Sequence, residues 1–198
     1  AREINEIALA RMLNGTGGMD EFAPALATFT GGSGAVAVLL TDGSFPNLRG
    51  HRLLGVVSEV APEFHQLCRW GIRPSSSTFQ CREASASGPN STLECRATWD
   101  GFYEQFMVTD SVAVLKNGVA LGQKTWAAFL DTMNWTPGSM DKLICHQVGS
   151  GHQDAILKSI GVPREKDYTT FRFLGNMGTA ALPVTAAIAD ERGVLKSG

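Results

Sequence analysis

The sequence predicts an α/β fold, because short apolar runs typical of buried strands alternate with segments that have helical periodicity. The first run, 35–40, is continuous and rich in valine and leucine, as strands buried on both faces of a sheet usually are. A helical stripe covers 112–133. A second strand is expected at 142–148 and is followed by a helical segment at 152–160.

The chain is expected to begin with a helix over residues 2–13, where apolar side chains recur at helical spacing. The glycine-rich stretch 14–18 would end this helix, since glycine tolerates the left-handed conformation at a helix C-terminus. Glycines at 31–34 precede the first strand and allow a close approach of the backbone to another segment. Residues 52–60 are a further strand candidate.

The composition changes between about residues 71 and 98, where serine, proline and glycine replace the apolar pattern. Two clusters of turn-forming residues, 74–77 and 85–91, contain little that a core could bury. We interpret 72–98 as a surface insertion within one domain, because the segments on either side look like parts of one fold.

The clearest helix prediction lies at 112–133, where apolar residues at alternating three- and four-residue steps form one stripe facing a core. Thr109 or Asp110 is suited to cap its N-terminus with a side-chain oxygen. A proline and a glycine at 137–138 lie beyond its end, and a last helix is expected through 180–189. The stripe consists of Val112, Leu115, Val119, Gly122, Trp126, Phe129 and Met133.

Charge and composition exclude several classes of function. The 198 residues carry a formal net charge of −2, whereas a nucleic-acid-binding protein should have a clustered basic excess. The apolar runs are of strand length, so no membrane span is expected, and the first residues resemble an amphipathic helix more than a signal peptide. The 4 cysteines predict reduced thiols in a cytoplasmic protein, although Cys81 and Cys95 could pair in an oxidising compartment.

Two polar residues, His146 and Asn176, are the candidate catalytic residues. Each lies at a predicted strand-to-helix junction in apolar surroundings, and sites in α/β folds gather at the carboxyl ends of strands. A histidine and an asparagine there could donate two hydrogen bonds to one oxygen that becomes negative during a reaction. A structural histidine and a turn-forming asparagine remain the alternative.

Other chemistries fit the sequence less well. Cys145 and His146 are neighbours on a predicted strand, so their side chains would point to opposite faces. This geometry argues against a Cys–His dyad or a shared metal. His146 and His152 lack the spacing of a helical ligand pair, and no carboxylate cluster lies nearby, so no metal site is expected. The 31–34 segment is not a nucleophile elbow, because that motif needs glycine where this chain has Ala35.

Three motifs then give a family resemblance. Residues 144–147, Ile-Cys-His-Gln, resemble the HQ motif of the β-ketoacyl-acyl-carrier-protein synthase III family. Residues 175–183 resemble the family's GN…(S/A)-x-P motif, and 29–40 is similar to its glycine-rich strand. The three motifs occur in the family's order.

A closer resemblance is to the thiolases of olefin biosynthesis, which join two fatty acyl chains head to head. It is carried by the blocks 66–69, 107–110 and 121–126. The resemblance covers nearly the whole chain, and the insertion at about 72–98 departs from it.

The resemblance implies a thiolase-like α-β-α-β-α layered fold, present here in part. Residues 1–50 would end its N-terminal half and 51–198 would form its C-terminal half. It also implies an acyltransferase of lipid metabolism that is usually a homodimer. A cysteine takes an acyl group from acyl-CoA or acyl carrier protein, and the enolate of a second thioester attacks it. His146 and Asn176 would stabilise the enolate oxygen, and no cofactor is implied beyond the thioester substrates.

Two departures qualify this expectation. None of the four cysteines matches the family's nucleophile, which should lie before residue 1, and a final strand and loop should follow residue 198. Residues 148–151 lack the basic residue that carrier-protein-dependent members have, which favours coenzyme A thioesters. An acyltransferase that forms no carbon–carbon bond, with His146 as base, and a non-catalytic partner subunit are the alternatives. Acyl chain length and the loss of a carboxyl group are left open.

Overall fold

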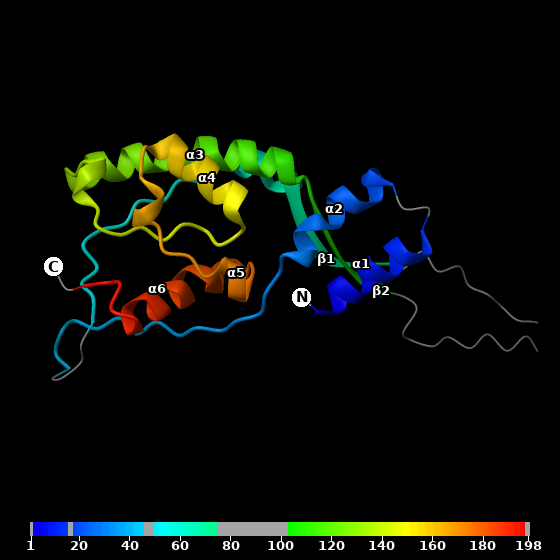
Figure 1. Ribbon diagram of the computed structural model, residues 1–198, viewed down its shortest axis with the longest axis horizontal. Helices are drawn as coiled ribbons and strands as arrows, with labels where there is room; N and C mark the ends of the chain where they lie inside the picture. The colour runs from blue at the N-terminus through cyan, green and yellow to red at the C-terminus, as the bar shows by residue number, and fades with distance from the viewer. Residues whose placement is uncertain (1, 16–17, 46–49, 75–102, 197–198) are drawn as a thin grey trace, which may run out of the picture.

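The computed structural model describes residues 2–15, 18–45, 50–74 and 103–196. Figure 1 shows two groups of elements, one built from the helices of the C-terminal half and the other from the first two helices and a two-stranded sheet. The helices are α1 (Arg2–Asn14), α2 (Met19–Phe29), α3 (Ser111–Met133), α4 (Ser150–Ile160), α5 (Phe171–Leu174) and α6 (Ala181–Glu191), and the strands are β1 (Cys68–Pro74) and β2 (Tyr103–Thr109).

The group that contains the first two helices has one helix that was predicted, α1, and one that was not, α2. α1 forms where helical spacing predicts it. α2 contains Pro24, and a proline inside a helix is a strong signal against helix formation. The helix forms despite this signal, and the rings of Phe22 and Phe29 stack along it with centroids 6.4 Å apart.

β1 and β2 form an antiparallel pair in which Cys68 is opposite Thr109 and Pro74 is opposite Tyr103. The pair corrects the start of the predicted insertion, because 72–74 belong to β1. Residues 75–98 of that insertion lie outside the described residues, and so does the possible pairing of its two cysteines.

α3 begins and ends as its sequence predicts. The carboxylate of Asp110 accepts a hydrogen bond of 2.9 Å from the N–H of Ala113, which is the predicted N-cap. Asn134 ends the helix in the left-handed conformation, with φ 53°. The apolar stripe is half-buried except at Val112, which is 80% exposed. No helix in the described ranges combines the length and apolarity needed to cross a membrane.

α4 packs along α3 through a close contact at Gly122. A methyl group at this position would lie 2.7 Å from Cδ1 of Ile156, so glycine permits the approach. The rings of Trp126 and Phe129 stack at 6.0 Å on the same stripe, which confirms that the stripe serves packing. α4 ends at Gly161 with φ 69°, and α6 forms where it was predicted.

The buried strand predicted at 35–40 and the strand candidate at 52–60 are both wrong for this chain. Both segments are extended, but within the described ranges neither belongs to a sheet. Most of their side chains are exposed, with Leu40 at 75% and Val56 at 78%. Apolar composition shows that a segment gains stability from burial, but it does not specify which neighbouring strand provides that burial.

Polar contacts hold the second of these segments against the helices. Nζ of Lys124 on α3 lies 2.7 Å from the carboxylate of Glu59. Nε2 of His51 lies 2.9 Å from the carboxylate of Asp190 on α6. The segment 51–60 therefore crosses from α6 to α3, as Figure 1 shows.

The strand predicted at 142–148 is reduced to one parallel bridge between Leu143 and Asp167. The N–H of Leu143 donates to the carbonyl of Lys166 at 2.8 Å, and the N–H of Tyr168 donates to the carbonyl of Leu143 at 3.0 Å. The chain then continues without regular structure to α4. This bridge fixes the start of the segment that carries His146.

Candidate active site

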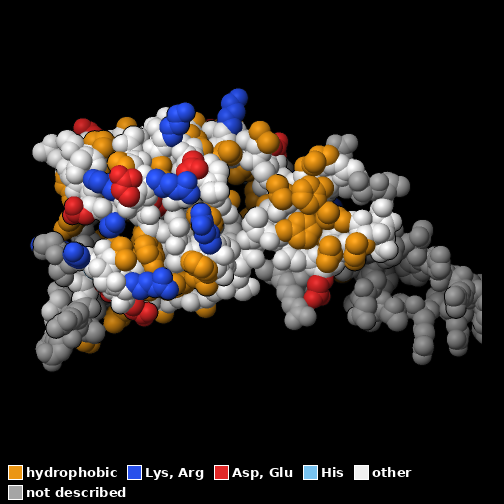
Figure 2. Space-filling model, in the orientation of Figure 1, with side chains coloured by type: hydrophobic (Ala, Val, Ile, Leu, Met, Phe, Trp, Pro, Cys, Tyr) orange, Lys and Arg blue, Asp and Glu red, His pale blue; other side chains and the backbone are white. Residues whose placement is uncertain are grey.

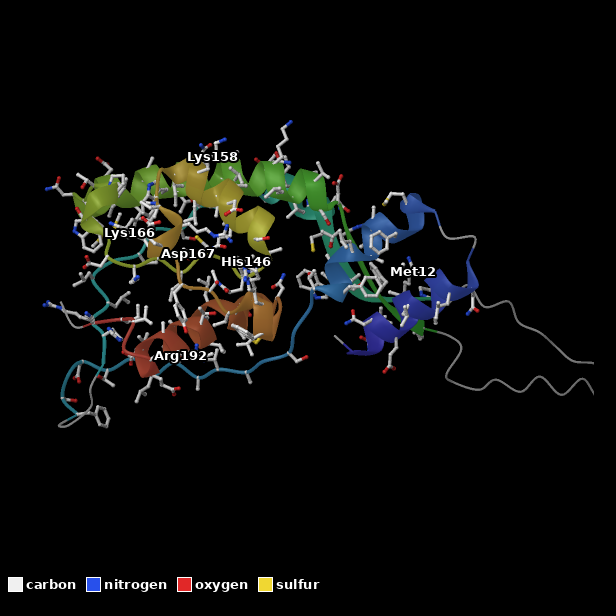
Figure 3. The ribbon with its side chains drawn as sticks, viewed as in Figure 1. Met12, His146, Lys158, Lys166, Asp167 and Arg192 are labelled. Carbon is white, nitrogen blue, oxygen red and sulfur yellow. The ribbon has the colours of Figure 1, made fainter. Side chains whose placement is uncertain are left out.

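His146 lies at the end of the extended segment, three residues after the bridge at Leu143 and four residues before α4 begins. Figure 3 shows its side chain between α4 and the elements of the C-terminal end. The side chain keeps access to solvent. Within the described part of the chain its ring nitrogens have no hydrogen-bond partner. A substrate oxygen could therefore reach the ring.

Cys145, the residue before His146, is not suited to act as a nucleophile. Burial, together with the negative charge and hydrogen bonding of Asp167, raises the pKa of the Cys145 thiol to about 12. The thiolate is the reactive form of cysteine, so a raised pKa suppresses its reactivity. This property agrees with the sequence analysis, which assigned no cysteine of this chain as the nucleophile.

We expect iodoacetamide at pH 8 to alkylate Cys145 in the folded chain at least about 10²-fold more slowly than in the unfolded chain, because each unit of pKa removes tenfold of the thiolate. Peptide mass spectrometry measures the labelled fraction with time. The same chain in guanidinium chloride is the control, and equal rates in the two conditions would contradict the assignment.

A second histidine lies beside the first. The rings of His146 and His152 meet edge to face, with centroids 6.2 Å apart. Burial lowers the pKa of His146, and burial together with the nearby His146 lowers the pKa of His152. Nδ1 of His152 is buried without a partner among the described residues. Both rings are therefore neutral at pH 7, and a neutral imidazole can still donate one hydrogen bond.

The lowered pKa values predict a loss of stability in acid. Since the folded chain holds both imidazoles neutral, the unfolded chain binds more protons once the pH falls below 6.5. The free energy of unfolding should then fall as the pH falls from 7 toward the folded-state pKa values. NMR should give titration midpoints below 6.5 for both rings. Replacing His152 by glutamine should flatten the dependence of stability on pH, and an unchanged slope would refute this explanation.

Asn176 is held by its backbone and by its own side-chain oxygen. Its N–H donates to the carbonyl of Thr30 at 2.8 Å, and its carbonyl accepts from the N–H of Gly32 at 2.8 Å. Oδ1 accepts from the N–H of Gly178 at 3.0 Å, which confirms the turn interaction expected of an asparagine between glycines. The Nδ2 amino group has no partner within the described ranges, so it is free to donate to a ligand.

The glycine-rich segment packs directly against the loop of Asn176, which confirms the close backbone approach predicted at 31–34. A Cβ atom on Gly32 would lie 1.9 Å from the carbonyl oxygen of Leu174, and one on Gly34 would lie 2.5 Å from Sδ of Met177. The segment therefore supports the loop that presents Asn176. The position of this loop depends on a backbone contact that side-chain patterning alone does not show.

Two residues that support the site, Gln147 and Asp167, were not predicted from the sequence alone. Gln147 is 1% exposed, and its side chain bonds to the segment that leads to Asn176. Asp167 accepts a 3.0 Å hydrogen bond from the N–H of Cys145. The position of Gln147 next to His146 in the motif could have indicated a supporting role. Asp167 lies in a polar loop, and no sequence pattern there points to such a role.

The chain is similar to several known proteins. Residues 130–198, which include both candidate residues, match the family model described as 3-oxoacyl-[acyl-carrier-protein] synthase III C terminal. The chain is 43% identical over its whole length to an acyl-CoA:acyl-CoA alkyltransferase of Shewanella oneidensis, of which it covers 50%. It matches Xanthomonas campestris OleA, solved with bound lauric acid and lauroyl-CoA, with a TM-score of 0.71 and 28% identity, over 100% of this chain and 49% of that one.

The C-terminal third of the chain thus matches the synthase III family model, and the chain as a whole is similar to relatives of this superfamily. Its fold is the thiolase-like α/β fold, since a synthase III of Xanthomonas oryzae also matches with a TM-score of 0.63 at 24% identity, over 100% of this chain and 48% of that one. The predicted fold class is thus confirmed, with part of the fold represented here. The chain spans about half the length of the curated relatives that it matches.

Proposed function

We propose that this chain supplies His146 and Asn176 to the active site of an enzyme that condenses two fatty acyl thioesters. The observation that carries the proposal is the identity of 43% across the whole chain with a protein named acyl-CoA:acyl-CoA alkyltransferase. The geometry of the two candidate residues supports it, because each presents an N–H donor without a partner in the described part of the chain.

The proposed reaction forms one carbon–carbon bond. An acyl group is first held as a thioester on a cysteine outside this chain. The second acyl thioester becomes an enolate by losing an α-proton to a base or by losing carbon dioxide. The enolate carbon attacks the thioester carbon of the first acyl group, and the cysteine leaves as a thiolate, which gives a β-keto thioester.

His146 and Asn176 would act on the enolate oxygen. Both groups are neutral donors, so neither has to lose a strongly bound proton before it can interact with the developing negative charge. Fixing Oδ1 of Asn176 on the N–H of Gly178 orients its amino group before substrate arrives. Donors that are already oriented stabilise the charge without reorganisation during the reaction.

The test uses the full polypeptide encoded with this sequence and a long-chain acyl-CoA. Intact-mass spectrometry should detect one acyl adduct on a cysteine outside this chain, and product analysis should detect a β-keto compound containing two acyl chains. An adduct whose acyl group passes only to alcohols or amines would support the alternative acyltransferase. The absence of both adduct and product would refute the proposal.

A partner-subunit function is a second candidate, favoured by the exposed apolar surface. Residues of α1 and α2 form part of it, with Leu13 at 76% and Met19 at 71% exposed. Figure 2 shows hydrophobic side chains gathered over this end of the molecule. The segments 35–40 and 52–60 expose further large apolar side chains, and extensive exposed apolar surface marks sites of protein contact. We expect it to be covered by further polypeptide of the same fold.

Co-expression distinguishes this second candidate from the first. The chain would be produced alone and together with the part of the Shewanella oneidensis relative that it does not match. A stable complex, with lower binding of an apolar dye than the chain alone, would support coverage of the surface. A monomer that gains nothing from co-expression would contradict it. Coenzyme A as the carrier, homodimer formation and a cytoplasmic location remain predictions.

A further inference from the structure

We infer that Gln147 is a positioning residue that fixes His146 relative to Asn176, an inference that rests on the proposed function. Gln147 is one of the largest fully buried side chains among the described residues, with 1% exposure. A buried amide must find partners for its oxygen and its amino group. Its two ends bond to two different segments, one beside His146 and one leading to Asn176.

The amino group of Gln147 controls the peptide before His146. Nε2 donates to the carbonyl of Cys145 at 2.7 Å. The N–H of Cys145 donates to the carboxylate of Asp167 at 3.0 Å. Cys145 is thus held at both its N–H and its carbonyl. Hydrogen bonds from side chains therefore fix the backbone orientation just before His146, where the segment is no longer paired with another strand.

The amide oxygen of Gln147 holds the segment before Asn176. Oε1 accepts from the N–H of Thr170 at 2.7 Å and from the N–H of Phe171 at 3.1 Å. These N–H groups stand at the start of α5, where no preceding helical carbonyl can accept from them. α5 is a single turn, and Gly175 directly after it leads into Asn176.

Glutamine has both functions that this position requires. Its oxygen accepts two hydrogen bonds and its amino group donates one, whereas glutamate would keep the acceptor and lose the donor. Methionine would lose both functions and leave three backbone groups without this partner, in one buried and two partly buried hydrogen bonds. Gln147→Glu therefore removes the donor contact alone, and Gln147→Met removes the donor and acceptor contacts together. Both variants keep the side chain nearly the same size.

The test compares these variants with Thr185→Val in the full-length enzyme. Thr185 is buried, and its hydroxyl lies 2.7 Å from that of Thr170 and donates to the carbonyl of Ala181 at 2.7 Å. The control therefore removes buried hydrogen bonds nearby and leaves the contacts of Gln147 intact. We expect Gln147→Met to lower kcat for condensation about 10²-fold, the effect of a small misplacement of catalytic groups, with acyl-adduct formation unchanged. Gln147→Glu should lower kcat by a smaller factor. Thr185→Val should lower Tm without lowering kcat.

An NMR readout separates positioning from a general loss of stability. In Gln147→Met the imidazole resonances of His146 should shift, and in Thr185→Val they should not. Unchanged His146 resonances, or a kcat that follows Tm equally in all three variants, would overturn the inference. If the wild type makes no condensation product while the His146 resonances still shift in Gln147→Met, the positioning role stands and the proposed function fails.

Discussion

Replacing Asn176 by aspartate should lower the rate of condensation roughly 10²–10³-fold, which is the usual effect of losing one oxyanion-hole donor. Aspartate keeps the oxygen that accepts from the N–H of Gly178 at 3.0 Å, so the turn can remain. It replaces the donating amino group by a second oxygen that carries negative charge. That charge would repel the enolate oxygen, so the effect should exceed that of a neutral replacement such as alanine.

The same experiment separates the two half-reactions. Acyl transfer to the nucleophilic cysteine should proceed in the Asn176→Asp variant, because the amide acts on the second substrate, and intact mass would show the adduct. Asn134→Asp is the matched control, since Asn134 is exposed at the end of α3 with φ 53°, a conformation that aspartate also tolerates. Condensation at the wild-type rate in Asn176→Asp would remove Asn176 from the proposed mechanism.

Replacing Gly32 by alanine should both destabilise the fold and abolish most of the condensation. The new Cβ would lie 1.9 Å from the carbonyl oxygen of Leu174, which is backbone and cannot rotate away. Hydrogen bonds of 2.8 Å on either side of Asn176, to Thr30 and to Gly32 itself, resist separation of the two segments. Overpacking of this kind costs about 1–3 kcal/mol, and any separation would move the loop of Asn176.

Two other glycines provide controls for this prediction. Gly34→Ala would meet Sδ of Met177 at 2.5 Å, an atom near the end of a flexible side chain, so its effect should be smaller. Gly118→Ala lies inside α3 with nothing within 4 Å of the new Cβ, and it should raise stability by about 0.5–1 kcal/mol. Thermal unfolding gives the order of the three variants. A Gly32→Ala protein as stable as Gly118→Ala would contradict the close contact.

Helices in this chain follow from local sequence, and most were predicted correctly. α3 has a cap at Asp110, an apolar stripe and an end at Asn134, and each of these depends on residues within a few positions of one another. α2 shows the limit of such reasoning, because Pro24 argues against a helix that the structure nonetheless contains. The extended segments show a second limit, since a strand exists only when another segment supplies hydrogen bonds.

Helices α1, α3, α4 and α6, the fold class and the two candidate catalytic residues could be predicted from the sequence alone, because periodicity, capping and short motifs are local properties. The way in which those residues are held depends on the tertiary structure. Gln147 joins His146 to the start of α5, and Gly32 lies against the backbone before Asn176, through contacts across more than twenty residues of chain. Such contacts depend on which segments the fold brings together, and a pattern within one segment carries no information about that choice.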